Sequence, residues 1–192
     1  MDEHNNTSPT LASLHEEMKR DTDLPLRGEA NLVFGEGDPY ARIVFIGEAP
    51  GKDEDEQVRP FVGRSGQLLR AMIRDVGLRE DEVYITNIVK RRPPNNRDPL
   101  PEEIAAYRPY LKRQLQLINP EIIVPLGRFS MNYFLPEAKI SRDQGKAFHV
   151  LGKYIFPIFH PAAALRSPSM KREFVASFAK LALLLAQLEK NV

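Results

Sequence analysis

Three polar side chains with different chemistry follow short apolar runs in this chain of 192 residues. The carboxylate of Glu48, the amide of Asn87 and the imidazole of His160 lie at or near the ends of the runs 43–46, 83–89 and 154–159. A carboxylate holds negative charge or orients water, an amide both donates and accepts hydrogen bonds, and an imidazole donates or transfers a proton near neutral pH. Each alone has a structural explanation, since histidines at strand ends often serve the fold and asparagines there often cap turns.

A glycine-rich turn, Gly47–Gly51, comes directly after the first of these runs. Turns of this kind expose backbone N–H groups that bind an anion or a carbonyl, although many only satisfy a sharp change of direction. The turn lacks the Lys-Ser/Thr pair of a P-loop and the glycine spacing of a dinucleotide fold. It marks a ligand site without naming the ligand.

The elements that must position these groups alternate between strands and helices. Short β-branched runs predict buried strands, and apolar residues at helical spacing predict helices. The predicted strands are 43–46, 83–89, 122–126 and 154–159, and the predicted helices are one capped by Ser8, 64–76, 102–118, a short one after Gly127 and a closing helix through 174–188. Turns or loops are expected at 21–27, 35–39 and 90–101.

This alternation indicates an α/β fold, a three-layer α/β/α sandwich with a mostly parallel central sheet. Ligands bind outside the carboxyl ends of the strands in such sheets, where Glu48, Asn87 and His160 are expected. The chain is long enough for one domain, predicted over 9–192, with residues 1–8 disordered.

The composition limits the class of protein. The net charge is +1, and no apolar stretch is long enough to cross a membrane, so a protein of the cytoplasm is expected. There is no cysteine, which excludes disulfides and thiolate chemistry, and the four histidines lack close metal-ligand spacing. No metal or organic cofactor is therefore expected.

Three longer motifs, taken in order, narrow the function. They read GEAPGKDEDEQVRPFVGRSGQLL, YITNIVKRRPPNNR and HPAAAL, and lie within residues 47–69, 84–97 and 160–165. Together they resemble the family-four, or thermophile-type, uracil-DNA glycosylases over nearly the whole chain. The resemblance implies the glycosylase fold and hydrolysis of the N-glycosidic bond of a deoxyuridine that has been flipped out of DNA, as in base excision repair.

The resemblance also implies a role for each pocket residue. Phe61 would stack on the uracil, and Asn87 would hydrogen-bond its Watson–Crick edge and reject cytosine. His160 would donate to O2 as negative charge grows there, like an oxyanion-hole donor. Backbone groups of Gly47, Glu48 and Ala49 would line the pocket. The Glu48 carboxylate would either place negative charge near the sugar cation or orient the attacking water, and the sequence does not decide between these roles.

Contacts to DNA are expected outside the pocket. The resemblance implies that HPAAAL continues into residues 166–169 as a loop that enters the groove, with Leu165 or Arg166 as the wedge and Ser167 beside it. Lys90 and Arg92, in the basic segment 90–97, would hold phosphates, although a solvated charged loop explains the same residues. Asp53 or Glu54 offers a second carboxylate, but a solvated acidic face is the favoured interpretation.

This sequence departs from the family at four positions. The family usually holds a [4Fe–4S] cluster on four cysteines, and the corresponding positions here are Asp21, Leu24, Arg91 and Tyr107. No cluster of that kind can form. We expect protein contacts to replace it, specifically an ion pair of Asp21 with Arg91 and packing by Tyr107.

Two alternative functions remain at the level of sequence. One is a non-catalytic module that binds uracil or DNA, and the other is a glycosylase for another base such as hypoxanthine. A relative that traps DNA covalently carries a histidine in a KRRIH insertion, and residues 90–95 here contain none, so turnover without an adduct is expected. A monomer acting on uracil-containing DNA at the nucleoid is the predicted state.

Overall fold

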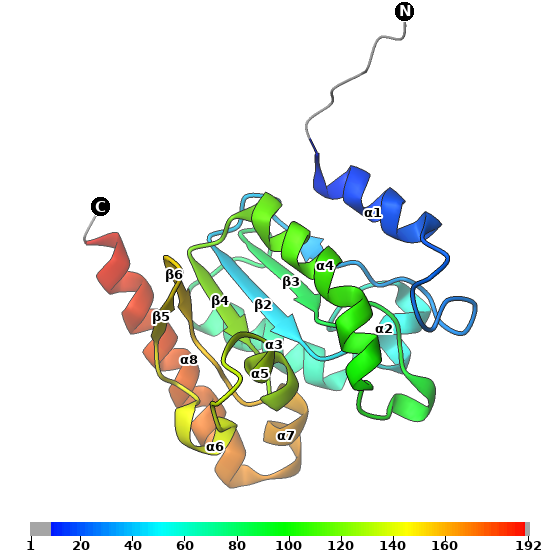
Figure 1. Ribbon diagram of the computed structural model, residues 1–192. Helices are drawn as coiled ribbons and strands as arrows, with labels where there is room; N and C mark the ends of the chain where they lie inside the picture. The colour runs from blue at the N-terminus through cyan, green and yellow to red at the C-terminus, as the bar shows by residue number, and fades with distance from the viewer. Residues whose placement is uncertain (1–8, 191–192) are drawn as a thin grey trace, which may run out of the picture.

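The computed structural model describes residues 9–190, and their strands form a six-stranded sheet (Figure 1). The strand order is β1 (Glu36–Gly37), β3 (Val83–Asn87), β2 (Ile43–Gly47), β4 (Ile122–Pro125), β6 (Lys153–Ile155) and β5 (Phe148–Val150). The inner strands β3, β2, β4 and β6 are parallel, and the edge strands β1 and β5 are antiparallel to their neighbours. The predicted mostly parallel sheet is confirmed.

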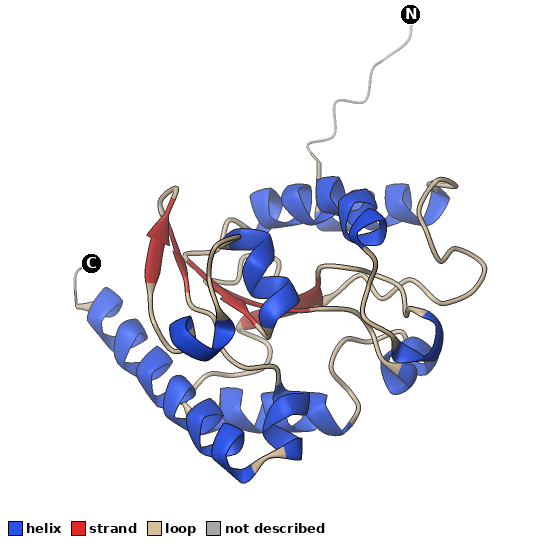
Figure 2. Cartoon of the chain, turned by 60° about the horizontal axis from the view of Figure 1, so that its bottom comes forward, coloured by secondary structure: helices blue, strands red, loops and turns tan. Residues whose placement is uncertain are grey.

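Helices cover both faces of the sheet (Figure 2). On one face lie α1 (Leu11–Arg20), α4 (Pro101–Ile118) and α5 (Arg128–Phe134), and on the other lie α3 (Arg64–Asp75), α7 (Pro161–Arg166) and α8 (Pro168–Glu189). Every residue of β2, β3 and β4 is buried, because each strand packs against helices on both sides. The three-layer α/β/α sandwich is confirmed.

Several predicted boundaries need correction. The first helix begins at Leu11 and is capped by Thr10, whose hydroxyl oxygen accepts from the N–H of Ser13; the predicted cap, Ser8, lies outside the described residues, as does the segment 1–8 predicted to be disordered. The expected turn 35–39 contains β1, and the last predicted strand, 154–159, is shortened to β6. The loop 90–101 contains a 3-10 turn, η1 (Pro94–Asn96).

Three short helices were not predicted. The acidic segment after the glycine-rich turn forms α2 (Lys52–Gln57), and α6 (Ile140–Asp143) precedes the β5–β6 hairpin. The HPAAAL segment, expected to be a loop, forms α7, because Pro161 suits the first turn of a helix and the alanines favour helix. Within residues 9–190, no helix combines the length and the apolar character needed to cross a membrane.

Candidate active site

A pocket of about 360 Å³ opens at the carboxyl ends of β2 and β3. It is lined by residues of the turn after β2, the loop before α3, the segment before α4, and α7: Glu48, Ala49, Pro50, Gly51, Glu54, Phe61, Ser65, Asn87, Pro93, Asn96, Arg97, Asp98, His160, Ala162, Ala163 and Arg166. The predicted site residues Glu48, Ala49, Phe61, Asn87, His160 and Arg166 are thus brought together, whereas Gly47, Lys90, Arg92, Leu165 and Ser167 do not line this pocket.

Asn87 ends β3 and faces the pocket with an unsatisfied acceptor. Its side chain is 2% exposed, and its Oδ1 has no hydrogen-bond partner. A buried polar atom left unpaired costs about 1–3 kcal/mol, and Asn87 Oδ1 is the one of the four such side-chain atoms in the described chain whose residue lines the pocket. Because Asn87 lines the pocket, an N–H group of a bound ligand would supply the hydrogen bond that this oxygen lacks.

Gly47 packs behind Asn87 and Phe61, the two residues that line this side of the pocket. In the sheet, Gly47 is paired with Asn87, and a Cβ added to Gly47 would lie 2.3 Å from Asn87 Oδ1 and 2.4 Å from Phe61 Cζ. Only glycine therefore fits behind these two side chains. The resemblance implied that a backbone group of Gly47 lines the pocket. The Gly47 carbonyl instead accepts from the N–H of Ile88 at 3.0 Å.

Phe61 is held in an uncommon backbone conformation. Its φ of 53° lies in the left-handed region, and its side chain is buried, with the ring centroid 5.9 Å from that of His160. The two rings are tilted by 34° and approach the pocket from different elements. The pocket therefore has an aromatic wall and an imidazole close to it.

His160 caps the start of α7 and is neutral at physiological pH. Its Nδ1 accepts a hydrogen bond from the backbone N–H of Ala162 at 3.2 Å, which leaves the ring proton on Nε2. Burial, reinforced by the positive charge of Arg166, lowers the pKa of His160 to about 4. The residue is therefore a neutral N–H donor at the pocket.

Glu48 has an unusual affinity for a proton. Burial raises the pKa of its carboxyl group to about 7, and the negative charge of Asp98 acts in the same direction, whereas Arg128 opposes the shift. Asp98 and Arg128 form an exposed ion pair at 2.7 Å. The sequence interpretation missed both residues, and they carry no local signal, because their effect depends on where the turn after β2, the segment before α4 and the start of α5 meet.

Glu54 serves the scaffold of the pocket. Its Oε1 accepts from the N–H groups of Val62 at 2.9 Å and Gly63 at 2.8 Å, and its Oε2 accepts from the N–H of Gly51 at 3.2 Å. The expected solvated acidic face is therefore wrong for Glu54, which is buried, while Asp53 is exposed. A glutamate three residues after the Gly51 cap was the available signal.

Lys90 does not lie where a phosphate could reach it. The side chain is 0% exposed, and its Nζ donates to Thr86 Oγ1 at 2.5 Å and Gln114 Oε1 at 2.6 Å, on the α4 face of the sheet. The prediction that Lys90 binds DNA is wrong, because the Lys90 side chain, three residues after the end of β3, is packed in the core. Burial lowers the pKa of Lys90 well below its usual value.

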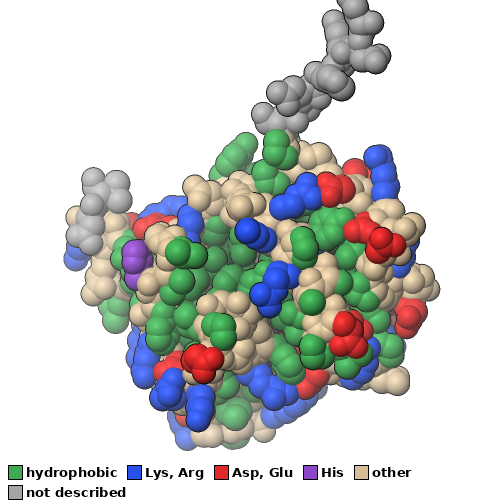
Figure 3. Space-filling model, in the orientation of Figure 1, with side chains coloured by type: hydrophobic (Ala, Val, Ile, Leu, Met, Phe, Trp, Pro, Cys, Tyr) green, Lys and Arg blue, Asp and Glu red, His purple; other side chains and the backbone are tan. Residues whose placement is uncertain are grey.

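The other predicted DNA contacts lie at the surface. Arg166 is exposed at the end of α7 and Leu165 is 43% exposed, whereas the Ser167 hydroxyl oxygen caps α8 by accepting from the N–H of Met170 at 3.5 Å. Arg92 is half-buried and donates to Asn96 Oδ1 at 2.6 Å. Lys and Arg side chains mix with Asp and Glu on the face seen in Figure 3, which carries no patch of one sign alone among the described residues.

The positions of the family's cluster cysteines do not fit an iron–sulfur cluster. No thiolate is present, and two of the four side chains are engaged by backbone: Tyr107 donates to the carbonyl of Pro25 at 2.7 Å, and Arg91 Nη1 donates to that of Ala30 at 2.8 Å. Within residues 9–190, no group of three or more histidine, cysteine or acidic residues lies close enough together to hold a metal ion.

The predicted ion pair of Asp21 with Arg91 is wrong. Asp21 Oδ2 accepts from the hydroxyl of Tyr110 at 2.6 Å, and none of the ion pairs in the described chain joins Asp21 to Arg91. Asp21 ends α1 next to α4, whereas Arg91 is buried and reaches the backbone of the loop after α1. Side-chain contacts do tie this loop to α4 and to the segment after β3, but through different pairs.

Comparison with known proteins agrees with the geometry. A family model described as the uracil DNA glycosylase superfamily matches residues 34–182. Type-4 uracil-DNA glycosylases from Sulfurisphaera tokodaii and Archaeoglobus fulgidus are each 47% identical to the chain, over 79% and 80% of its length and 73% and 81% of theirs. One from Thermotoga maritima is 46% identical over 80% of this chain and 82% of its own. The chain therefore belongs to the uracil DNA glycosylase superfamily, as its motifs predicted.

Proposed function

We propose that this protein is a monofunctional uracil-DNA glycosylase of base excision repair. It flips deoxyuridine out of DNA, hydrolyses the N-glycosidic bond and leaves an abasic site. One observation carries this proposal: the buried, unpartnered Oδ1 of Asn87 in a pocket with an aromatic wall. The names of the similar relatives support it.

The Asn87 amide matches the edge of uracil. Its Oδ1 accepts from the N3–H of the base, and its NH₂ group donates to O4, so one side chain satisfies both atoms. Cytosine has an acceptor at N3 and a donor at the adjacent position, which would leave two buried polar pairs unmatched. A mismatch of this kind discriminates far more strongly than a missing methylene group.

The bond-breaking step places negative charge on uracil. The C1′–N1 bond breaks, its electron pair remains on the base, and the charge spreads to O2, where the Nε2–H of His160 donates a hydrogen bond. Burial lowers the pKa of His160 to about 4, so the ring is neutral, and a neutral imidazole donates to this charge while it keeps its N–H proton at neutral pH. The donor is aligned before the reaction by the bond of Nδ1 to Ala162.

Glu48 acts on the sugar side of the same bond. In its ionised form its negative charge stabilises the oxocarbenium-like sugar, and the carboxylate accepts the proton of the water whose oxygen bonds to C1′. The uracil anion then takes a proton from solvent, and no covalent bond to the protein forms. Its pKa of about 7 makes ionisation of Glu48 dependent on pH in the neutral range.

Contacts to DNA and cellular state complete the proposal. Arg166, at the rim of the pocket, holds a phosphate, and the exposed Leu165 is the wedge that fills the space left by the flipped base. The protein acts as a monomer on the nucleoid in the cytoplasm. Size-exclusion chromatography with light scattering tests the monomer.

The deciding experiment is a cleavage assay on labelled oligonucleotides with uracil, hypoxanthine or thymine opposite guanine, followed by alkali. Cleavage only at uracil is expected. Cleavage at hypoxanthine alone would replace the substrate, and binding without cleavage would make the protein a recognition module. A band that survives a denaturing gel would contradict hydrolysis without an adduct.

A further inference from the structure

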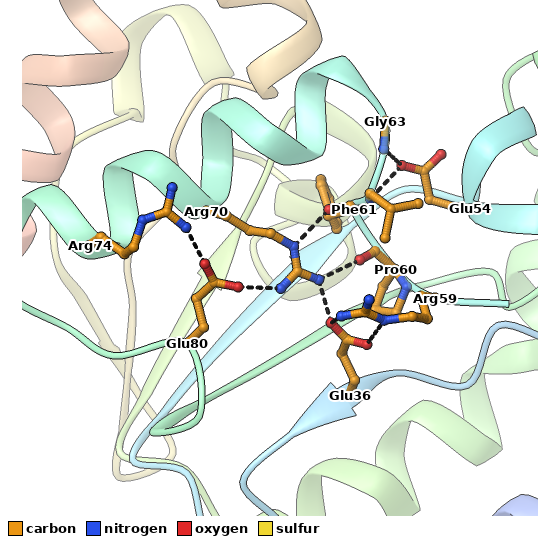
Figure 4. Close-up of polar contacts among 10 residues, drawn as sticks. Glu36, Glu54, Arg59, Pro60, Phe61, Gly63, Arg70, Arg74 and Glu80 are labelled. Atoms are coloured by element: carbon orange, nitrogen blue, oxygen red, sulfur yellow. Dashed lines mark hydrogen bonds and ion pairs between the residues drawn. The ribbon is translucent and has the colours of Figure 1, made fainter. Parts of the chain in front are cut away.

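The loop that carries Phe61 is clamped from two sides. Glu54 of α2 binds the N–H groups that follow Phe61, and Arg70 of α3 binds the carbonyls on the other side (Figure 4). Arg70 Nε donates to the carbonyl of Phe61 at 2.9 Å, and Nη2 donates to that of Pro60 at 2.9 Å. Neither bond reaches the pocket, which Arg70 does not line.

This clamp acts on a residue that needs one. Phe61 has a φ of 53°, a conformation that L-residues other than glycine, asparagine and aspartate rarely adopt, so surrounding contacts must maintain it. The α3 backbone also comes very close: a Cβ on Gly66 would lie 2.0 Å from the carbonyl carbon of Phe61. The ring direction is thus set by the backbone of its own loop.

The guanidinium of Arg70 is itself fixed by acidic residues. The Arg70 side chain is 12% exposed and is paired with Glu36 of β1 through Nη2 and with Glu80 through Nη1 at 2.7 Å. Arg59 binds the same Glu36 carboxylate at 2.8 Å. A planar fork with five donors can serve two successive carbonyls and two carboxylates together, which a lysine ammonium cannot do with the same geometry.

We propose that Arg70 is a positioning residue for uracil excision. It holds the backbone of Pro60 and Phe61 so that the Phe61 ring forms the stacking wall beside Asn87 and His160. The proposal rests on the stacking role given to Phe61 above. The same contacts could instead serve stability alone, and the two explanations differ in what happens once the Phe61 ring is removed.

The chain offers a matched control on the same helix. Arg74 binds Glu80, the carboxylate that Arg70 also uses, but has no bond to the Phe61 loop, and its side chain is 58% exposed. Arg70→Lys keeps the charge and removes the fork, and Arg74→Lys makes the same change without touching the loop. Both variants are compared at temperatures well below their measured midpoints of unfolding, so that only folded protein is assayed.

The measurements are the single-turnover rate on uracil in single-stranded DNA and inhibition by free uracil. Arg70→Lys is expected to slow excision roughly tenfold or more and to weaken inhibition by uracil, whereas Arg74→Lys stays within about twofold of the wild type. In a Phe61→Ala background, Arg70→Lys is expected to cost less than about twofold, because there is no ring left to position.

The possible outcomes separate the two proposals. If Arg70→Lys matches Arg74→Lys while Phe61→Ala loses activity, the positioning role of Arg70 is wrong and the stacking role stands. An Arg70→Lys loss that persists in full without the Phe61 ring would also overturn the positioning role. Wild-type activity of Phe61→Ala would remove the stacking role, and the proposal for Arg70 with it.

Discussion

Asn87, at the end of β3, and Lys90, three residues later, are both buried polar residues, but their hydrogen bonding differs. Asn87 lines the pocket and its Oδ1 has no partner, whereas the Lys90 amino group has two short hydrogen bonds in the core under α4. Both are almost fully buried. The difference lies in whether the fold satisfies the polar group.

This contrast distinguishes a residue that binds the ligand, Asn87, from one that stabilises the fold, Lys90. An unsatisfied buried acceptor is a cost that a ligand can remove, so it marks the place where binding energy is gained. The Lys90 amine has its hydrogen bonds satisfied and is part of the packing, joined through Gln114 to Tyr84 and to the carbonyl of Phe34. The first should matter for activity and the second for stability, which gives the following tests.

The largest difference is expected between the two deletions themselves. Asn87→Ala should lower the single-turnover rate on uracil by about 10³-fold or more, because the base then lacks its polar match. Lys90→Met should leave that rate within about threefold. Similar losses in both variants, with intact circular dichroism spectra, would abolish the distinction between pocket and core.

His160 tests whether the neutral donor belongs with Asn87 on the pocket side. His160→Ala should reduce the rate by about 10²–10³-fold, the usual cost of losing an oxyanion donor. Because burial lowers the pKa of His160 to about 4, nitrogen-15 NMR of the ring should show an N–H on Nε2 from pH 5.5 to 8. An imidazolium signal at pH 7 would show that the proposed donor is wrong.

Glu48 gives the pocket a dependence on pH. Its pKa of about 7 is above that of an ordinary carboxyl group, so protonation removes its charge as the pH falls. The rate constant should therefore decrease about tenfold per pH unit below 7 and level off above it. In Glu48→Gln the rate should be low and nearly flat, and an unchanged slope in this variant would assign the titration to another group.

Lys90 should make the stability of the protein, and not its activity, depend on pH. Burial lowers its pKa in the folded protein, so between that value and 10.5 the unfolded chain binds a proton that the folded chain lacks. The free energy of unfolding should therefore rise with pH in this window, by up to about 1.4 kcal/mol per unit.

The control is an exposed lysine on α4, the helix that Lys90 contacts through Gln114. Lys90→Met should remove this slope, and Lys112→Met, at an exposed position of α4, should retain it in urea titrations between pH 7 and 10. If Lys90→Met and the wild type have parallel curves, the Lys90 amino group is not buried as described.

Arg166 is expected to give the smallest effect. Loss of one phosphate contact should weaken DNA binding only a few-fold, but it should reduce the slope of log affinity against log salt by about 0.9. Arg79→Ala, in the segment that precedes the amino end of β3 and outside the pocket lining, should leave the slope unchanged. Equal slopes in both variants would move the phosphate contact elsewhere.

Much of the fold was predictable, because continuous apolar runs and helical spacing report burial directly. The strands around Phe45, Ile85 and Val124 and the helix 64–76 follow this pattern. The short helices α2 and α7 were missed because six residues give little periodicity. Glu54 looked like part of a charged surface, since the N–H groups it binds are eight and nine residues away.

The sequence by itself determined the chemical groups and their order: the glycine-rich turn, then Phe61, then Asn87 and His160 at or near the ends of predicted strands. The tertiary structure decided which of these groups are satisfied. It turned Lys90 into the core, paired Asp21 with Tyr110 instead of Arg91, and left the Asn87 oxygen unpaired in a pocket. The reason is physical: residue type fixes what a side chain can donate or accept, but only packing fixes which partners lie within reach.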